Sequence, residues 1–188
     1  MDGRRGFLAI MACAALPVRA ADASHGFGRA PPRDVGGALE GVDQHGVPFH
    51  LQRVAGAPAL VFFGFTHCGS TCPLALATAR ELLQPGGVAG EAAIVFVTLD
   101  PLNDGPQQLR AFLERIDGRL IGLTGTPQQI ERSAERYGVA LRASAGGVEH
   151  SSMWYLLDAA SRVRRVYPHT TPAGALLADI RRLRAQQG

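Results

Sequence analysis

Two cysteines lie four residues apart in the segment Leu60–Pro73, which reads LVFFGFTHCGSTCP. The first part of this segment, Leu60–Phe65, is continuously apolar, which is typical of a buried strand of a parallel sheet. Helix-forming residues follow Pro73. Cys68 and Cys72 are therefore predicted to lie where a strand ends and a helix begins, and the unpaired amide groups there favour thiolate over thiol. Thiolates are nucleophiles, redox groups and ligands of soft metals.

The start of the chain predicts export. Arg4-Arg5 precede an apolar stretch, Phe7 to Val18, that is shorter than the roughly 18 residues a membrane-spanning helix needs. Two sites for signal peptidase follow, and the arginine pair is also similar to a twin-arginine signal. We predict an export signal at 1–23, a Gly- and Pro-rich linker at 24–37 and one domain at 38–188. The exported chain would be periplasmic, with its N-terminal segment cleaved, lipidated at Cys13 or kept as an inner-membrane anchor.

Export reduces the number of cysteines that remain in the mature chain. Of the three cysteines in the chain, Cys13 lies in the predicted signal, so the exported chain keeps Cys68 and Cys72. In an oxidising compartment, two such thiols form a structural disulfide, a redox pair or a pair of metal ligands. The spacing alone leaves these three possibilities open.

Length and charge bound the class of protein. A chain of 188 residues with 46% hydrophobic content can bury the core of one domain. The formal charge is +3, and removal of residues 1–20 takes away three positive charges and one negative charge, which leaves +1. A chain so close to neutral gives no support for nucleic-acid binding, and we expect no nucleic-acid partner.

The remaining pattern predicts a single α/β domain. A hairpin at 38–52 turns at Asp43-Gln44-His45-Gly46, and Thr126-Pro127-Gln128-Gln129 has the spacing of a helix capping box. The order of elements predicts one thioredoxin-like domain, a central mixed sheet flanked by helices with the hairpin as an N-terminal extension. Strands are predicted at 60–65, 92–99, 120–123, 153–157 and 163–166, and helices at about 72–83, 105–113, 126–137 and 171–183.

Four segments, in the same order, resemble the Sco/SenC family of copper chaperones. Members of that family carry Gly-Phe/Tyr-Thr-His-Cys-x-x-x-Cys-Pro, Asp-Pro-x-x-Asp, Gly-Leu-Thr-Gly, and His-Ser-Ser followed by Tyr-Leu-Leu-Asp. The matching stretches are Gly64–Pro73, Asp100–Asp104, Gly122–Gly125 and His150–Asp158. The chain has Gly69 where the family usually has proline, and Glu149 where it usually has aspartate.

The resemblance implies a metallochaperone that binds one copper ion, as Cu(I) or Cu(II), through Cys68, Cys72 and His150. The implied partner is cytochrome c oxidase subunit II, which holds a dinuclear copper centre, or another copper-site protein, with a periplasmic copper chaperone as the donor. Such a donor set is chemically reasonable, because thiolates select Cu(I) and imidazole suits both oxidation states. Asp100 and Asp104 follow the second core strand, and we expect them to hold the thiol loop.

Two other activities compete with copper binding. A periplasmic thiol–disulfide oxidoreductase would use Cys68 and Cys72 as its catalytic pair, although three residues rather than two separate them and no proline adjoins His150. The loop Cys68–Thr71 also faintly resembles that of thiol peroxidases, whose downstream Trp-Asn-Phe segment is missing. His67 adjoins Cys68, but neighbouring residues seldom bind one ion together.

A third group of residues concerns partners rather than the thiols. Arg162, Arg164 and Arg165 lie close together near the end of the chain. Such a cluster is either a solvated face or a surface that docks an acidic partner.

Overall fold

The computed structural model of the chain describes residues 28–32, 35–67, 71–144, 147–151 and 153–186, with residues 71–72, 141–144 and 147–150 described by their backbone alone. Most of the predicted strands and helices are present within one or two residues of their predicted ends. The strands are β1 (Glu40–Asp43), β2 (Pro48–His50), β3 (Ala59–Gly64), β4 (Ala93–Thr98), β5 (Ile121–Thr124), β6 (Leu141–Ser144), β7 (Gly147–His150), β8 (Met153–Leu157) and β9 (Val163–Pro168). The helices are α1 (Thr71–Leu82), α2 (Pro106–Glu114), α3 (Pro127–Arg136) and α4 (Ala173–Ala185), with a short 3-10 helix, η1 (Leu51–Val54).

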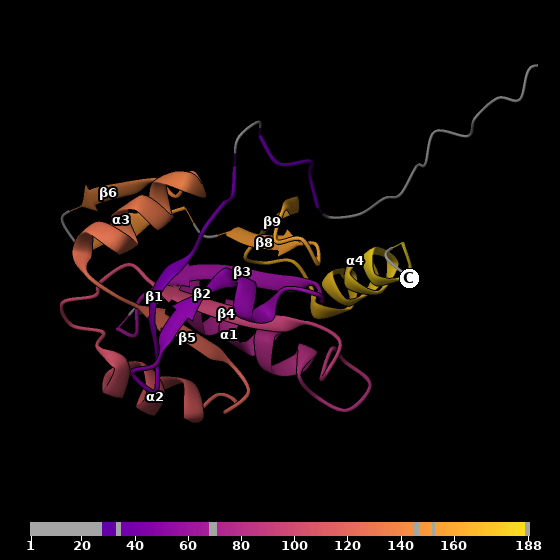
Figure 1. The fold of residues 1–188 in the computed structure, drawn as a ribbon, viewed down its shortest axis with the longest axis horizontal. Coiled ribbons are helices and arrows are strands. Elements are labelled where there is room, and N and C mark those ends of the chain that lie inside the picture. Colours follow the sequence, from indigo (N-terminus) through magenta and orange to yellow (C-terminus); the bar gives the residue numbers. More distant parts are fainter. Residues whose placement is uncertain (1–27, 33–34, 68–70, 145–146, 152, 187–188) are drawn as a thin grey trace, which may run out of the picture.

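A seven-stranded mixed sheet forms the centre of the molecule, in the order β2-β1-β5-β4-β3-β8-β9 (Figure 1). Strands β3, β4 and β5 are parallel, while β1 pairs antiparallel with β5 and β8 antiparallel with β3. The predicted mixed sheet flanked by helices is thus confirmed. Because β3 is central and covered on both faces, all six of its residues are buried, which explains its continuous apolar run.

The core lies in two layers, one on each face of the sheet. Alternate residues of β3 point to opposite faces, so Phe62 packs with α1, α2 and α4 while Phe63 packs with α3 and the N-terminal hairpin. Figure 1 shows α3 on one side of the sheet and α1 and α2 on the other. The ring of Phe62 lies 4.9 Å from that of Trp154, and this contact ties β3 to β8.

The capping box predicted for α3 is present. The hydroxyl of Thr126 accepts from the N–H of Gln129, and the side chain of Gln129 accepts from the N–H of Thr126. Pro127 occupies the first turn of the helix, where its missing N–H costs nothing.

The N-terminal hairpin belongs to the main sheet. The buried Gln44 side chain donates to the carbonyl of Leu120 (2.9 Å) and accepts from the N–H of Gly122 (2.8 Å), so the turn of the hairpin is bonded to the start of β5. Parts of the predicted linker also touch the domain. Arg29 forms a β-bridge with Val166, and the N–H of Gly36 donates to the carbonyl of Arg136.

Two features of the chain were not predicted. The second strand of the first hairpin ends at His50, and Leu51 begins η1 instead of continuing the strand. Residues 141–150, for which no element was predicted, form a separate antiparallel pair, β6 and β7. Their short segments have only weak apolar alternation and do not join the main sheet, so the usual signal of a strand is small.

We predict that Asp43→Asn destabilises the protein at neutral pH. Asp43 accepts from the N–H groups of His45 (2.9 Å) and Val47 (3.0 Å) and from Arg53 (2.9 Å). Burial alone would raise the pKa of this carboxyl, but the hydrogen bonds outweigh it and hold that pKa below its ordinary value. The free energy of unfolding should fall by about 1–2 kcal/mol at pH 7.

The difference in the free energy of unfolding between the parent and Asp43→Asn should shrink as the pH falls. A lowered native-state pKa stabilises the protein at every pH above the unfolded-state pKa of about 3.9, and this stabilisation is lost as the pH falls through the native-state value. Urea unfolding at a series of pH values measures the effect. A stability difference between parent and variant that grew toward acid pH would contradict it.

Candidate metal centre

The thiol segment, residues 67–72, follows the end of a central strand and extends into the first turn of a helix. Strand β3 ends at Gly64 and α1 begins at Thr71, so Cys72 is the second residue of the helix. The predicted strand-to-helix position of Cys72 is therefore confirmed at the level of the backbone. Cys68 and the thiol of Cys72 lie outside what the structure describes.

His150 reaches the same edge of the sheet from far along the chain. It is the last residue of β7 and pairs with Leu141, and β8 starts three residues later at Met153. Strands β8 and β3 are antiparallel with Phe62 opposite Trp154, so the start of β8 lies beside the end of β3. The backbone thus brings His150 and the thiol segment to one edge. The imidazole itself lies outside the described side chains, so the three-ligand set remains a prediction.

An aromatic cluster holds the end of β3 against the start of β8. The rings of Phe63, Tyr137 and Tyr155 lie 5.1 to 5.9 Å from one another, two of the three pairs edge to face. Burial raises the pKa of Tyr155 to about 12, and burial also raises the pKa of Tyr137. Both phenols are therefore neutral near pH 7, and the cluster packs β3 against β8 without adding charge.

Asp104 fixes the chain just before the first cysteine. Its side chain is fully buried, and Oδ2 accepts from the N–H of Thr66 (2.9 Å) and the hydroxyl of Thr98 (2.7 Å), while Oδ1 accepts from the hydroxyl of Thr66 (2.5 Å). Thr98 is the last residue of β4, and Thr66 lies two residues before Cys68. The predicted role of Asp104 in holding this loop is confirmed for Thr66.

The imidazole of His67 lies close to the carboxylates of Asp100 and Asp104. Its Nε2 lies 3.5 Å from Oδ2 of Asp100 and its Nδ1 lies 3.9 Å from Oδ1 of Asp104. Its ring stacks on Phe65 at 4.9 Å, although 57% of the side chain is exposed. This arrangement was not predicted from the sequence. The signal was the Asp-Pro-x-x-Asp spacing itself, which places two carboxylates after β4 at the carboxyl edge that β3 also reaches.

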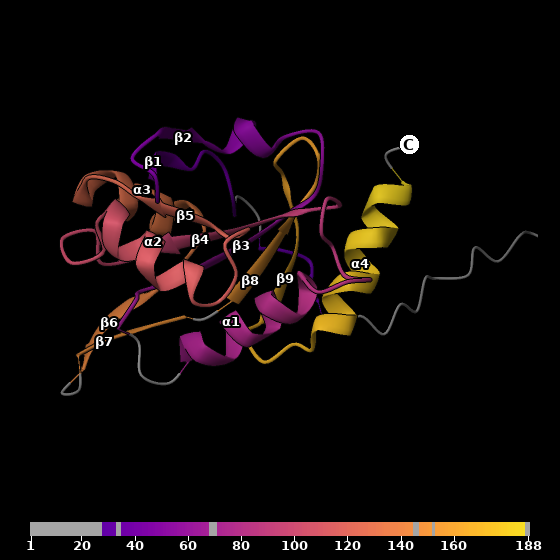
Figure 2. The same ribbon diagram turned by 90° about the horizontal axis from the view of Figure 1, so that it is seen from below.

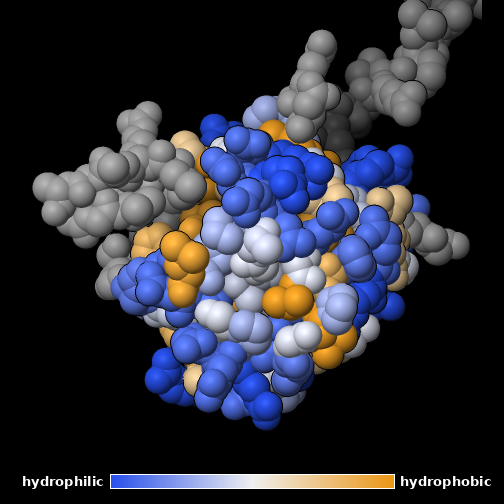
Figure 3. All heavy atoms as spheres, turned by 60° about the vertical axis from the view of Figure 1, so that its left-hand side comes forward, coloured by the Kyte–Doolittle hydropathy of each residue, from blue (hydrophilic) through white to orange (hydrophobic). Residues whose placement is uncertain are grey.

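Two residues that are close in sequence to this edge have exposed apolar side chains. Leu74, in the first turn of α1, is 49% exposed, and Leu102, between the two aspartates, is 82% exposed. On the face shown in Figure 3, hydrophobic residues form separate patches in a largely hydrophilic surface.

Neither a cluster of metal ligands nor a membrane-spanning helix is present in the described part of the chain. No group of three or more His, Cys, Asp or Glu side chains in it could hold a metal ion. In the same residues, no helix combines the length and the hydropathy required to cross a bilayer.

We predict that Asp104→Asn loosens the thiol segment. An asparagine amide would present N–H groups to donors that now face a carboxylate, so the free energy of unfolding should fall by about 2 kcal/mol. The specific consequence should be faster hydrogen exchange at the Thr66 amide, measured by NMR. Asp100→Asn is the matched control, since Asp100 accepts from Asn103 at the surface and does not bond to Thr66. Unchanged protection of Thr66 in Asp104→Asn would contradict the anchoring role.

A family model and the related proteins assign the chain to the same family. The model of the SCO1/SenC family matches residues 28–185. A SCO2-like protein of Rickettsia conorii is 31% identical over 150 residues, which cover 73% of this chain and 72% of that protein.

Solved structures share the fold. ScoI of Bradyrhizobium japonicum, solved with copper bound, is 28% identical with a TM-score of 0.72 and covers 79% of this chain and 99% of its own. BsSco, described as having a disulfide switch and as a member of the Sco family of cytochrome c oxidase assembly proteins, is 23% identical with a TM-score of 0.69. It covers 84% of this chain and 98% of its own, and at this identity the likeness shows the fold alone. The fold is thioredoxin-like, as predicted, and the chain belongs to the SCO1/SenC family.

Proposed function

We propose that the protein is a metallochaperone that binds one copper ion through Cys68, Cys72 and His150. The observation that supports the proposal is the register between β3 and β8, because the thiol segment follows β3 in the chain and His150 precedes β8. Family membership and the copper-bound structure of ScoI from Bradyrhizobium japonicum support it.

The proposed donors fit copper in its reduced state. Two thiolates and an imidazole form a soft donor set, which favours Cu(I), and the imidazole is also acceptable to Cu(II). Cu(I) with two thiolates carries one net negative charge. The backbone N–H groups at the start of α1 favour such a charge, because Cys72 lies in the first turn of that helix.

Anchors on both sides of the thiol segment support this proposal. Before it, Thr66 is bonded to the buried Asp104, and at its other end α1 begins at Thr71. Fixed positions on either side of a ligand-bearing segment reduce the conformational entropy that is lost when its donors bind an ion.

Copper is the cargo, so the site has to release it as well as hold it. Three protein ligands leave a position for a ligand of the partner, and transfer then proceeds by exchange of one ligand at a time. The exposed Leu74 and Leu102 offer apolar contact to that partner. We propose that the recipient is the dinuclear copper site of cytochrome c oxidase subunit II or another copper-site protein. A periplasmic copper chaperone would supply the ion to an exported chain, free or tethered to the inner membrane.

A thiol–disulfide oxidoreductase is the second candidate, and the position of Cys72 at a helix start favours it. In this reaction one thiolate attacks a disulfide of the partner and forms a mixed disulfide with release of one partner thiol. The other thiolate then attacks the mixed disulfide. The products are a Cys68–Cys72 disulfide and two partner thiols, so two electrons pass to the partner. Reduction of this kind would prepare the thiols of a copper site.

We predict that His150→Ala weakens Cu(I) binding by at least tenfold, roughly the effect of losing one charge-assisted or metal-directed contact, and leaves the fold intact. The measurement is competition with a chromogenic Cu(I) chelator, with the full chain reduced and anaerobic. His45→Ala is the matched control because His45 is an exposed residue of the turn between β1 and β2. Copper held by the His150→Ala protein as tightly as by the parent would exclude the three-ligand site.

The thiols should separate the candidate functions. Cys68→Ser and Cys72→Ser should each abolish tight binding of one Cu(I), whereas Cys13→Ser should have no effect. Reduction of insulin disulfides at rates typical of thioredoxins, without tight copper binding, would favour the oxidoreductase. Thiols that are unreactive in the native protein would instead indicate a structural disulfide.

A further inference from the structure

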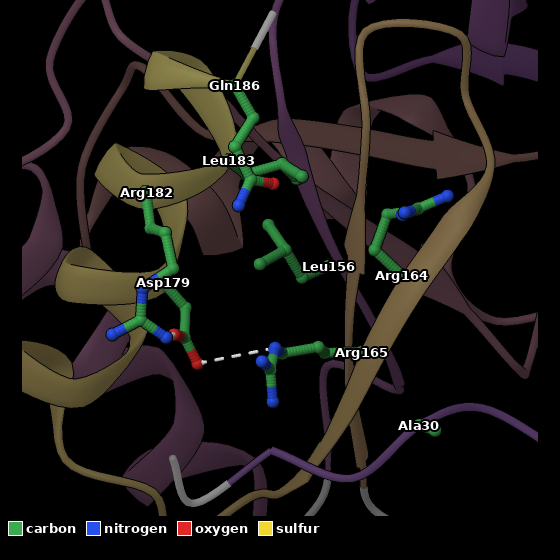
Figure 4. A pocket seen from close by; sticks show the side chains of 8 residues that line it. All are labelled: Ala30, Leu156, Arg164, Arg165, Asp179, Arg182, Leu183 and Gln186. Atoms are coloured by element: carbon green, nitrogen blue, oxygen red, sulfur yellow. Dashed lines mark hydrogen bonds and ion pairs between the residues drawn. The ribbon is translucent and has the colours of Figure 1, made fainter. Parts of the chain in front are cut away.

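A hollow of about 260 Å³ lies between α4 and β9 (Figure 4). In Figures 1 and 2, α4 lies at the opposite end of the molecule from the β6–β7 hairpin, which leads into the candidate metal centre. The hollow is therefore separate from that centre. It has an apolar part and a strongly basic part, and it is lined by Ala30, Leu156, Arg164, Arg165, Asp179, Arg182, Leu183 and Gln186.

The buried carboxylate of Asp179 organises the basic part. Asp179 is 5% exposed, and it accepts a hydrogen bond from the hydroxyl of Tyr167 (2.9 Å) and one from Nη1 of Arg182 (3.1 Å). Nε of Arg165 lies 3.8 Å from the same carboxylate. Figure 4 shows these two arginines approaching Asp179 from opposite walls, Arg182 from α4 and Arg165 from β9.

The two guanidinium groups are thereby held in place before any ligand arrives. Arg165 has a further bond, from Nη1 to the carbonyl of Gly28 (3.2 Å), and its side chain is only 31% exposed. Arginine presents five donors in a rigid fork, so these bonds leave other N–H groups of each guanidinium for an anion. A site that is already ordered binds at a lower entropic cost.

The lining carries an excess of two positive charges. It contains three arginines and, among the described residues, one carboxylate, that of Asp179. The third arginine, Arg164, lies 4.0 Å from Asp158, which already holds Arg162 at 3.1 Å. In Figure 4 the Arg164 guanidinium points away from Asp179, so it has to rotate about its exposed side chain to join the other two. An anion with two negative charges would balance the excess.

We propose that this hollow binds a phosphate group in its doubly charged form, either as free phosphate or a phosphate monoester or as the headgroup of a lipid. A phosphate monoester carries close to two negative charges near pH 7 on one compact group, and its oxygens match the arginine fork. The apolar side chains of Leu156 and Leu183 offer space for an organic group attached to the phosphate. A concave site of this size suits a small ligand better than the surface of a protein partner.

The test is a titration of the full chain with inorganic phosphate and with glycerol 3-phosphate, at constant ionic strength, followed by NMR. Saturable shifts should appear in the Nε–H signals of Arg164, Arg165 and Arg182. Arg164→Gln should weaken phosphate binding by about tenfold, since one charge-assisted bond is lost, and it leaves the partners of Asp179 in place. Arg182→Gln should have at least the same effect.

Matched controls distinguish a site from general attraction to arginines. Arg162→Gln removes a charge two residues away on the same side of the domain, and Arg181→Gln removes one from the neighbouring position of α4, where Arg181 donates to the carbonyl of Gly86. Neither lines the hollow, so neither should weaken binding by more than about twofold. Equal weakening by all four variants, or an absence of saturation in the millimolar range, would overturn the proposal.

Vesicles separate the two sources of phosphate. Co-sedimentation with vesicles containing phosphatidic acid, reduced by Arg164→Gln but not by Arg162→Gln, would assign the hollow to a lipid headgroup. Binding of glycerol 3-phosphate without vesicle binding would assign it to a soluble phosphate. A glutamate-rich peptide that displaced phosphate and bound more tightly would overturn the phosphate assignment in favour of an acidic protein. None of these results depends on copper binding.

Discussion

The buried carboxylate of Asp104 is the interaction on which the geometry of the candidate metal centre depends. It joins the residue that ends β4, Thr98, to Thr66, which follows β3, and it lies two residues before the start of α2. Burial of a carboxylate is costly unless its oxygens are well bonded, and here they accept from one N–H and two hydroxyls. Two parallel strand ends and one helix start are thereby held at one point.

The second constraint is the register between β3 and β8. A shift by one residue would turn Trp154 and Tyr155 to the wrong faces of the sheet, where each would lose its aromatic partners. The register is therefore strongly specified by the core. Since His150 lies just before β8, the same core packing sets where its backbone stands relative to the thiol segment.

Much of this arrangement was predictable because its causes are local. The apolar run of β3, the capping box at Thr126 and the turn at Asp43 each depend on residues close together in sequence. The bonds of Asp104 to Thr66 cross 38 residues, and periodicity carries no information about such contacts. The β6–β7 pair escaped prediction for a related reason, because its two short strands form a sheet of their own, apart from the main sheet, and their sequence lacks a strong apolar alternation.

The two aspartates that organise the two ends of the molecule have different kinds of partners, and this difference bears on what each end can bind. Asp179 is bonded to arginines, so its charge is compensated and the hollow keeps an excess of positive charge. Asp104 is bonded to neutral donors, and with Asp100 it faces only the imidazole of His67 among described basic groups. Negative charge beside the thiol segment disfavours a pair of bare thiolates and favours a bound cation. The described charges at this edge therefore support the proposal that it binds a cation.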